Sequence, residues 1–285
     1  MPAVDVLICT YERPDPVMHV VADVLLQLGA DDRVWVYDQS QSQGATVAAI
    51  AELGDARCVH QSGPARGLPN ARNAALTLGE RPLVLFFDDD VRLEPGCIEA
   101  HRRALSQPSV GASVGRVDDR GMRYNLRKTG NRVSASGRVR VNLSGAEPAD
   151  VQSVHGCNMG FRRSILQSVG GFDPGFGGTA LLEEADVAER VRKAGWTIRY
   201  APDAALVHLA IGSGGVRVGT AEATERWRFH NTGRFMAKHR GVRGIARAVP
   251  TFAAIAAKRG AQWSDPTAPL RLMTAFWTGV FGAGR

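Results

Sequence analysis

Three consecutive aspartates follow a run of apolar residues in the segment LVLFFDDDVRLEPG, residues 83–96. Carboxylates this close together repel one another and resist joint ionisation, so the folded protein has to compensate them. Carboxylate oxygens suit Mg²⁺ and Mn²⁺, and a bound cation removes the repulsion. The apolar run predicts a buried strand, which would place Asp88, Asp89 and Asp90 in a crevice. The segment therefore favours a divalent metal site, with a solvated acidic turn as the alternative.

Other polar side chains follow the ends of further predicted strands. Arg13 comes shortly after the first strand, and Arg66 and Arg72 flank the start of a helix. Asp38 ends the second strand, where it could accept a hydrogen bond from a base or a ribose. His208 ends a short strand, and although a lone histidine is more often structural, its imidazole would suit Mn²⁺. A Mg²⁺ or Mn²⁺ ion with few protein ligands keeps positions open for phosphate oxygens, so we expect a phosphate-containing ligand.

Carboxylates also open the predicted helix that begins in the segment LLEEAD. Acidic residues are favoured at a helix N-terminus by the helix dipole alone, and this is the interpretation we adopt for Asp186. Glu183 and Glu184 could instead act as a general base that removes a proton from a hydroxyl. The glycine-rich loop GGFDPGFGG, residues 170–178, would be able to close over a substrate.

The elements that position these residues alternate at short spacing over the first ninety residues. The pattern predicts strands over residues 4–9, 33–40, 56–61 and 82–90, and helices over residues 14–29, 45–54 and 68–79. This alternation indicates a mostly parallel sheet flanked by helices. In such a sheet the ligand crevice lies beyond the carboxyl ends of the strands, so the polar residues would gather at one rim.

The second half of the chain is less regular. Residues 111–153 predict antiparallel strands and a loop, and residues 158–178 predict a helix followed by the glycine-rich loop. The remaining elements are a helix over 181–195, short strands over 196–202 and 205–209, and helices over 220–239, 242–260 and 269–282.

Composition limits the class of protein. The chain has 285 residues, 44% of them hydrophobic, which is typical of a globular protein. Its formal net charge of +7 favours acidic binding partners. Nucleic acid is the weakest candidate because no basic run is interleaved with aromatic residues. The four scattered cysteines, and the lack of a signal-peptide pattern or a long apolar run, predict a cytoplasmic protein.

Seven segments, in order and with similar spacing, resemble the inverting glycosyltransferases of family 2, which have the GT-A fold. They are LICTYERP (7–14), VWVYDQS (34–40), GLPNARNAAL (67–76), LVLFFDDDVRLEPG (83–96), GCNMGFRRSILQSVGGFD (156–173), EEADVAERVRKAGW (183–196) and APDAALVH (201–208). Together they cover about residues 4–210, which is a far more specific signal than an aspartate triplet alone.

The resemblance implies how a nucleoside-diphosphate sugar would bind. Thr10 and Arg13 would line the nucleotide pocket, and Asp38 and Arg72 would contact the nucleobase. Neither contact identifies the base or the sugar.

The resemblance also implies a metal site for Mn²⁺ or Mg²⁺. Asp88 and Asp90 match the family's Asp-x-Asp motif, with Asp88 near the ribose and Asp90 on the metal. Asp89 would help either of them, and His208 matches a position that often completes the metal site.

On the acceptor side, the family's Glu-Asp pair falls on Glu183 and Glu184. Glu184 stands where the catalytic base is usually Asp, so either glutamate remains a candidate for the base. Asn158 and Met159 lie in a segment that tends to border the acceptor pocket.

The implied enzyme is a metal-dependent, inverting glycosyltransferase of α/β class with a mostly parallel central sheet and a helical C-terminal extension. The GT-A domain would span residues 1–215, with a nucleotide-binding half to about residue 110 and an acceptor half from residue 111, and the extension would span 216–285. It would transfer a sugar to a hydroxyl of a glycan, lipid-linked or small-molecule acceptor, as in the synthesis of cell-surface polysaccharides or glycolipids. A nucleotide-sugar-binding module without catalysis and a sugar-nucleotide-forming nucleotidyltransferase are the alternatives.

The C-terminal extension is basic and partly amphipathic. One side of its last helix carries Leu270, Met273, Trp277 and Val280 or Phe281, and Arg243, Arg247, Lys258 and Arg259 are nearby in the sequence. This face would pack against the GT-A domain or a homodimer partner. Alternatively, it would rest on an anionic membrane, peripherally on the cytoplasmic face of the inner membrane.

Overall fold

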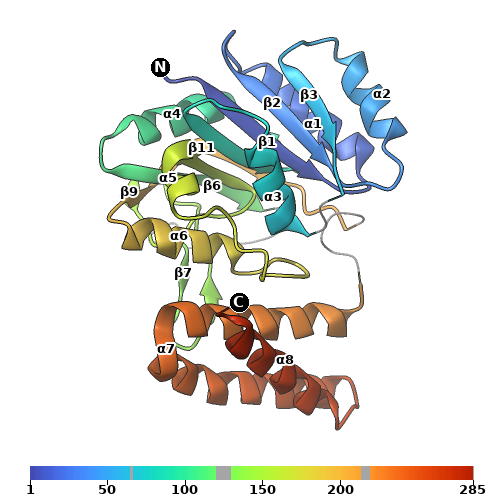
Figure 1. Cartoon of the computed structure of the whole chain (residues 1–285), viewed down its shortest axis with the longest axis vertical. Coiled ribbons are helices and arrows are strands. Elements are labelled where there is room, and N and C mark those ends of the chain that lie inside the picture. Colours follow the sequence, from blue (N-terminus) through green and yellow to red (C-terminus); the bar gives the residue numbers. More distant parts are fainter. Residues whose placement is uncertain (65–66, 120–129, 213–218, 285) are drawn as a thin grey trace.

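A nine-stranded mixed sheet forms the centre of the computed structural model, which describes residues 1–64, 67–119, 130–212 and 219–284 (Figure 1). The strand order is β3-β2-β1-β4-β10-β6-β11-β5, and β9 pairs with β11. The parallel part consists of β1 (Val4–Thr10), β2 (Arg33–Asp38), β3 (Cys58–Ser62) and β4 (Leu83–Asp88). The α/β class and the mostly parallel arrangement of its first half are as predicted.

The helices of this half connect its parallel strands. They are α1 (Pro14–Leu25), α2 (Gly44–Glu52) and α3 (Leu68–Leu76). The first five residues of β4 are all buried, which explains their continuous apolar sequence, because helices cover both faces of such a sheet.

The second half of the sheet differs in several places from the sequence prediction. Its strands are β5 (Val91–Leu93), β6 (Val110–Asp119), β9 (Ala149–Asp150), β10 (Asn158–Arg162) and β11 (Thr197–His208), and its helices are α4 (Cys97–Ser106), α5 (Arg163–Ser168) and α6 (Glu183–Lys193). Residues 158–162 form a strand between β4 and β6 rather than the start of a helix. The two short strands expected after α6 are one strand, whose pairing with β6 shifts register between Ala201 and Leu206.

A short hairpin and two long helices lie below the sheet in Figure 1. The hairpin is formed by β7 (Arg132–Val133) and β8 (Val139–Arg140), and the helices are α7 (Ala221–Gln262) and α8 (Ala268–Gly282). At Gly241 the backbone of α7 leaves the helical conformation, with φ +59°, and the two halves of α7 pack with α8. Among the described residues, no helix combines the length and hydropathy needed to cross a bilayer.

The C-terminal helices, α7 and α8, have their own hydrophobic core. Its largest side chains from these helices are Phe229, Phe235, Phe252 and Phe276. The same core includes Phe176 from the glycine-rich loop, Leu182 directly before α6, and Ala185 of α6. The C-terminal helices are therefore packed against the sheet domain through the segment that leads into α6.

The crossing of α7 and α8 depends on glycine. A Cβ atom on Gly279 would lie 1.9 Å from the carbonyl oxygen of His230, so Gly279→Ala forces the helices apart. We expect this change to destabilise the protein by about 1–3 kcal/mol, seen as a lower melting temperature. Gly282→Ala in the same helix is the control, because its Cβ would meet only Arg234, at 3.8 Å. Equal melting temperatures for the two variants would contradict this close packing.

Candidate active site

The carboxyl ends of β1, β2 and β4 meet at one rim of the sheet. The register pairs Thr10 with Asp38 across β1 and β2, and Cys9 with Asp88 across β1 and β4. Asp89 and Asp90 form the turn between β4 and β5, so the aspartate triplet lies at this rim.

Asp88, Asp90 and His208 form a candidate metal cluster. One ligand atom from each lies within 4.8 Å of the others. His208 reaches the rim because β11 pairs with β5, where His208 is opposite Val91. The two carboxylates suit Mn²⁺ or Mg²⁺ and the added imidazole suits Mn²⁺, so these residues fit such an ion.

The charge of Asp90 is balanced by its neighbours. Its carboxylate lies 3.3 Å from Nε2 of His208 and 3.2 Å from Nη1 of Arg13, and it accepts a hydrogen bond from the backbone NH of Ile211. Burial opposes ionisation, but the hydrogen bond with His208 and the charges of His208 and Arg13 outweigh it, so the pKa of Asp90 lies below its usual value.

Asp89 shares Arg13 with Asp90 but also contacts Thr10. Its two oxygens accept hydrogen bonds from the hydroxyl of Thr10, at 2.7 Å, and from Nη1 of Arg13, at 2.8 Å. Burial raises the pKa of Asp89 to about 6 against the opposing charge of Arg13. Thr10 and Arg13 thus compensate the middle aspartate and fix the shape of the turn.

Arg72, in α3, connects the aspartates to the start of α6. Its Nη2 donates to the carbonyl oxygen of Gly156 at 2.9 Å and to Oδ1 of Asp88 at 3.2 Å, and its Nη1 forms an ion pair with Glu183. Both Arg72 and Glu183 are buried. Arg72 therefore holds the aspartates at the end of β4 close to the start of α6.

Glu184 is half-buried beside this ion pair. Burial raises the pKa of Glu184, and the positive charges of His155 and Arg72 oppose the rise. Nδ1 of His155 and Oε2 of Glu183 are buried and have no hydrogen-bond partner among the described residues. His155 was not predicted, because it precedes the segment GCNMG in a stretch without periodic pattern.

Some side chains that we expected to contact the nucleotide or the acceptor are buried inside the protein. Asp38 is fully buried, accepts a hydrogen bond from the backbone of Ser40 and lies 3.3 Å from His60. Asn158 and Met159 are also fully buried within the sheet, so their side chains do not reach a surface where an acceptor would bind. The reason is that residues 158–162 form a central strand. Arg66 lies outside the described residues.

A family model fits the region that carries this site. The model for Glycosyl transferase family 2 matches residues 5–170, which is more than half of the chain. The chain belongs to glycosyl transferase family 2. The match includes β1, β4 and the aspartate triplet of this glycosyltransferase, whereas Glu184 and His208 lie beyond it.

Solved structures show the same GT-A fold at low sequence identity. GalNAc-T7, solved with UDP, GalNAc and Mn²⁺, has a TM-score of 0.65 and 14% identity, with 83% of this chain and 51% of that chain covered. The mannosyltransferase PcManGT from Pyrobaculum calidifontis, in complex with GDP-Man and Mn²⁺, has a TM-score of 0.60 and 15% identity, covering 99% and 87%. S. aureus TarS 1–349, in complex with UDP-GlcNAc, has a TM-score of 0.61 and 15% identity, covering 82% and 65%.

These similarities have limits in length. The family 2 glycosyltransferase described here spans about half the length of the GalNAc-T7 chain and about two thirds of the TarS 1–349 chain. No curated protein sequence matches it.

Proposed function

We propose that this family 2 glycosyltransferase is metal-dependent and inverting, and that it transfers a sugar from a nucleoside-diphosphate sugar to an acceptor hydroxyl. The observation that supports this most is the metal cluster, in which ligand atoms of Asp88, Asp90 and His208 lie within 4.8 Å of one another. Arg72 joins Asp88 to Glu183, so the cluster adjoins the glutamates of α6. The similar structures with UDP, GDP-Man or UDP-GlcNAc, two of them with Mn²⁺, agree with this substrate class.

Asp88, Asp90 and His208 would hold Mn²⁺ or Mg²⁺. When bound, such an ion supplies Lewis-acid stabilisation of the charge that develops on diphosphate oxygens. Thr10 and Arg13 shape the turn that presents these ligands. Positive charge from Arg13 and Arg72 adds to the stabilisation of the leaving group.

We assign the general base to Glu184. Glu183 is already committed to an ion pair with Arg72 and is 1% exposed, whereas Glu184 is half-buried and has a raised pKa. A base with a raised pKa takes up a proton from a hydroxyl more readily. Attack by the acceptor oxygen opposite the leaving diphosphate would invert the anomeric carbon without a covalent enzyme intermediate.

For the organisation of the chain we propose a catalytic domain over residues 1–215, with a donor half up to about residue 110, and a helical extension over 216–285. We further propose that the enzyme acts in the synthesis of polysaccharides or glycolipids, with a glycan or a lipid-linked molecule as the acceptor.

The proposed activity can be tested by release of nucleoside diphosphate. The full chain is incubated with UDP-, GDP- and dTDP-sugars, Mn²⁺ and a set of acceptor glycans and glycolipids. We expect release from one nucleotide class, and its loss when the metal is chelated. Binding without release would favour a nucleotide-sugar-binding module. The absence of both binding and release would contradict the proposal.

We also propose that the C-terminal helices bind an anionic membrane surface. Residues 220–285 contain eleven Lys and Arg against three Asp and Glu, while the rest of the chain is nearly balanced. On α8, Leu270 and Phe281 are 72% and 77% exposed and Trp277 is 37% exposed. Met273 and Val280 are half-buried against the hydrophobic core of the C-terminal helices. The exposed apolar stripe is therefore narrower than predicted.

Co-sedimentation with lipid vesicles tests this surface. The full chain should pellet with phosphatidylcholine vesicles that contain phosphatidylglycerol, and less with phosphatidylcholine alone. The double variant W277A/F281A should bind the anionic vesicles about tenfold or more weakly, because each buried aromatic side chain contributes roughly 1.5–3 kcal/mol. Equal pelleting of both proteins, or no pelleting of either, would exclude the proposed membrane contact.

A further inference from the structure

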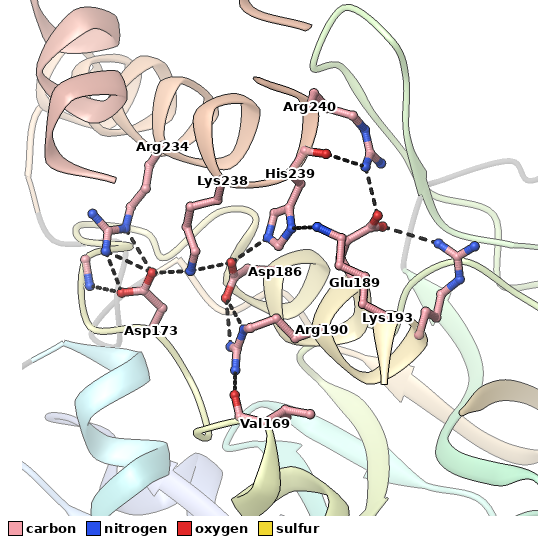
Figure 2. Close-up of polar contacts among 12 residues, drawn as sticks. Val169, Asp173, Asp186, Glu189, Arg190, Lys193, Arg234, Lys238, His239 and Arg240 are labelled. Carbon is pink, nitrogen blue, oxygen red and sulfur yellow. Dashed lines mark hydrogen bonds and ion pairs between the residues drawn. The ribbon is translucent and has the colours of Figure 1, made fainter. Parts of the chain in front are cut away.

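A single lysine of α7 connects both ends of the segment that carries the candidate base. Nζ of Lys238 lies 2.5 Å from Oδ2 of Asp173 and 2.6 Å from Oδ1 of Asp186 (Figure 2). Asp173 lies in the glycine-rich loop, and Asp186 lies in the first turn of α6. We call residues 173–186 the base segment, because Glu183 and Glu184 lie within it.

Each carboxylate has further hydrogen-bonding partners. Arg234, also in α7, donates from Nε and Nη2 to the two oxygens of Asp173, at 3.0 and 2.9 Å. Asp186 is fully buried and contacts His239 at 2.7 Å and Arg190 at 2.7 Å. Burial opposes its ionisation, but these partners and Lys238 hold the pKa of Asp186 well below its usual range. The carboxylate is therefore ionised and depends on side chains from α7.

Apolar contacts attach the same segment a second time. Phe176 is fully buried in the core of the C-terminal helices, and the cations of Arg234 and Lys238 lie 5.8 and 5.6 Å from the centre of its ring. The side-chain NH₂ of Asn231 donates to the carbonyl oxygen of Gly177 at 3.0 Å. The loop that the sequence suggested as a mobile lid is thus built into the packing of α7.

The backbone next to the candidate base adopts an unusual conformation. Leu182, directly before Glu183, has φ +77°, in the left-handed region that a branched side chain rarely occupies. Such a conformation persists only where the surroundings impose it. The side chain of Leu182 is 1% exposed in the core of the C-terminal helices, which supply that constraint.

We infer that the C-terminal helices position the catalytic carboxylate, with Lys238 as the principal positioning residue. This inference rests on the proposed function, because it assigns the helices a task in that reaction in addition to any membrane contact. Lys238 does not touch the metal cluster; it acts through Asp173 and Asp186 on the turn that presents Glu184. Loss of its charge should leave the donor half of the site intact and displace the base.

The test compares three variants of the full chain. Lys238→Met removes the ammonium and keeps most of the side-chain length, and Lys238→Arg restores a positive donor. Arg226→Met is the matched control, because Arg226 is exposed on the same helix and the substitution removes the same positive charge. The probes are UDP and GDP with Mn²⁺ for binding, nucleotide release for turnover, and amide hydrogen exchange for the base segment.

We expect Lys238→Met to bind the nucleotide within about twofold of wild type but to turn over at least tenfold more slowly per nucleotide-binding site. Lys238→Arg should recover most of this rate, and Arg226→Met should keep all of it. A purely structural role would lower the number of binding sites rather than the rate per site. Wild-type turnover per site in Lys238→Met, or an equal loss in Arg226→Met, would overturn the inference.

Hydrogen exchange decides the inference without an activity measurement. In Lys238→Met, amides of the base segment should exchange at least tenfold faster, while those of β1 and β4 stay unchanged. If exchange in this region matches wild type, the positioning role is wrong whatever the rates are. If wild type neither binds nor releases nucleotide, the proposed function fails, and exchange still reports on Lys238.

Discussion

Replacing Glu184 by Gln should lower the turnover of glycosyl transfer by about 10²–10⁴-fold, the usual contribution of a general base. Glutamine has the same size but does not accept the proton of an attacking hydroxyl. Nucleotide binding with Mn²⁺ should stay within about twofold, because Glu184 takes no part in the metal cluster. Nucleotide release with acceptor, alongside isothermal titration with UDP or GDP, measures both quantities.

Glu183→Gln is the matched control, and it should behave differently. Its charge is paired with the buried Arg72, so its loss leaves that buried cation with Asp88 as its remaining carboxylate partner and lowers the melting temperature. If Glu183→Gln folds normally and loses the activity that Glu184→Gln retains, the assignment of the base is reversed.

The pH dependence of turnover gives a second test of Glu184. The reactive form of the base is deprotonated, so turnover should rise with pH as Glu184 loses its proton. Burial raises the pKa of Glu184. The increase in turnover should therefore occur at a pH above about 4.3, the pKa of a free glutamate. Glu184→Gln should lose this limb of the profile.

Replacing Asp90 by Asn should remove metal-dependent nucleotide binding and, with it, activity. Loss of an outer-shell partner of a metal site typically costs about 10–100-fold in affinity, so loss of a direct ligand should cost about 100-fold or more. Asparagine keeps an acceptor for the backbone NH of Ile211, and Arg13 keeps Asp89, so the metal-free protein should remain folded. Isothermal titration of UDP and GDP, with and without Mn²⁺, measures the effect.

Asp89→Asn provides the contrast within the same turn. Asp89 is bound to Thr10 and Arg13, so its replacement should lower the melting temperature more than the affinity for the metal. If Asp89→Asn abolishes metal-dependent binding and Asp90→Asn does not, the metal ligands are misassigned.

The rim of the sheet could be predicted from the sequence because local patterns determine it. Apolar runs ended by polar residues predict the parallel strands, and parallel strands bring their carboxyl ends together. Asp38 and Asp88 are expected at one rim on this basis, and the pairing of both β2 and β4 with β1 agrees. The identity of the family adds the order of the segments, which periodicity alone does not supply.

The contacts of the base segment lay beyond such reasoning. Asp186 was interpreted as a dipole-favoured residue of a helix start, whereas its partner His239 is 53 residues away in the sequence. Amphipathic periodicity shows which face of a helix is buried but not which element covers it. The same limit explains β10, where the neighbouring strands β4 and β6 outweigh a local helical pattern.

Helix α4 illustrates a different limit. Its buried residues include His101 and Arg102, which a hydropathy pattern counts as polar. His101 is satisfied by Ser113 and by Asn158, and Arg102 by Asp32, so tertiary hydrogen bonds allow polar side chains to be buried. Their environment is apparent only once the sheet has formed.

The most direct test is anomalous diffraction at the manganese edge from crystals of the full chain soaked with Mn²⁺ and UDP or GDP. The account predicts one strong peak within bonding distance of Asp90, with Asp88 and His208 beside it and diphosphate oxygens completing the coordination. A bound nucleotide without any manganese peak at these residues, or manganese elsewhere on the protein, would contradict it.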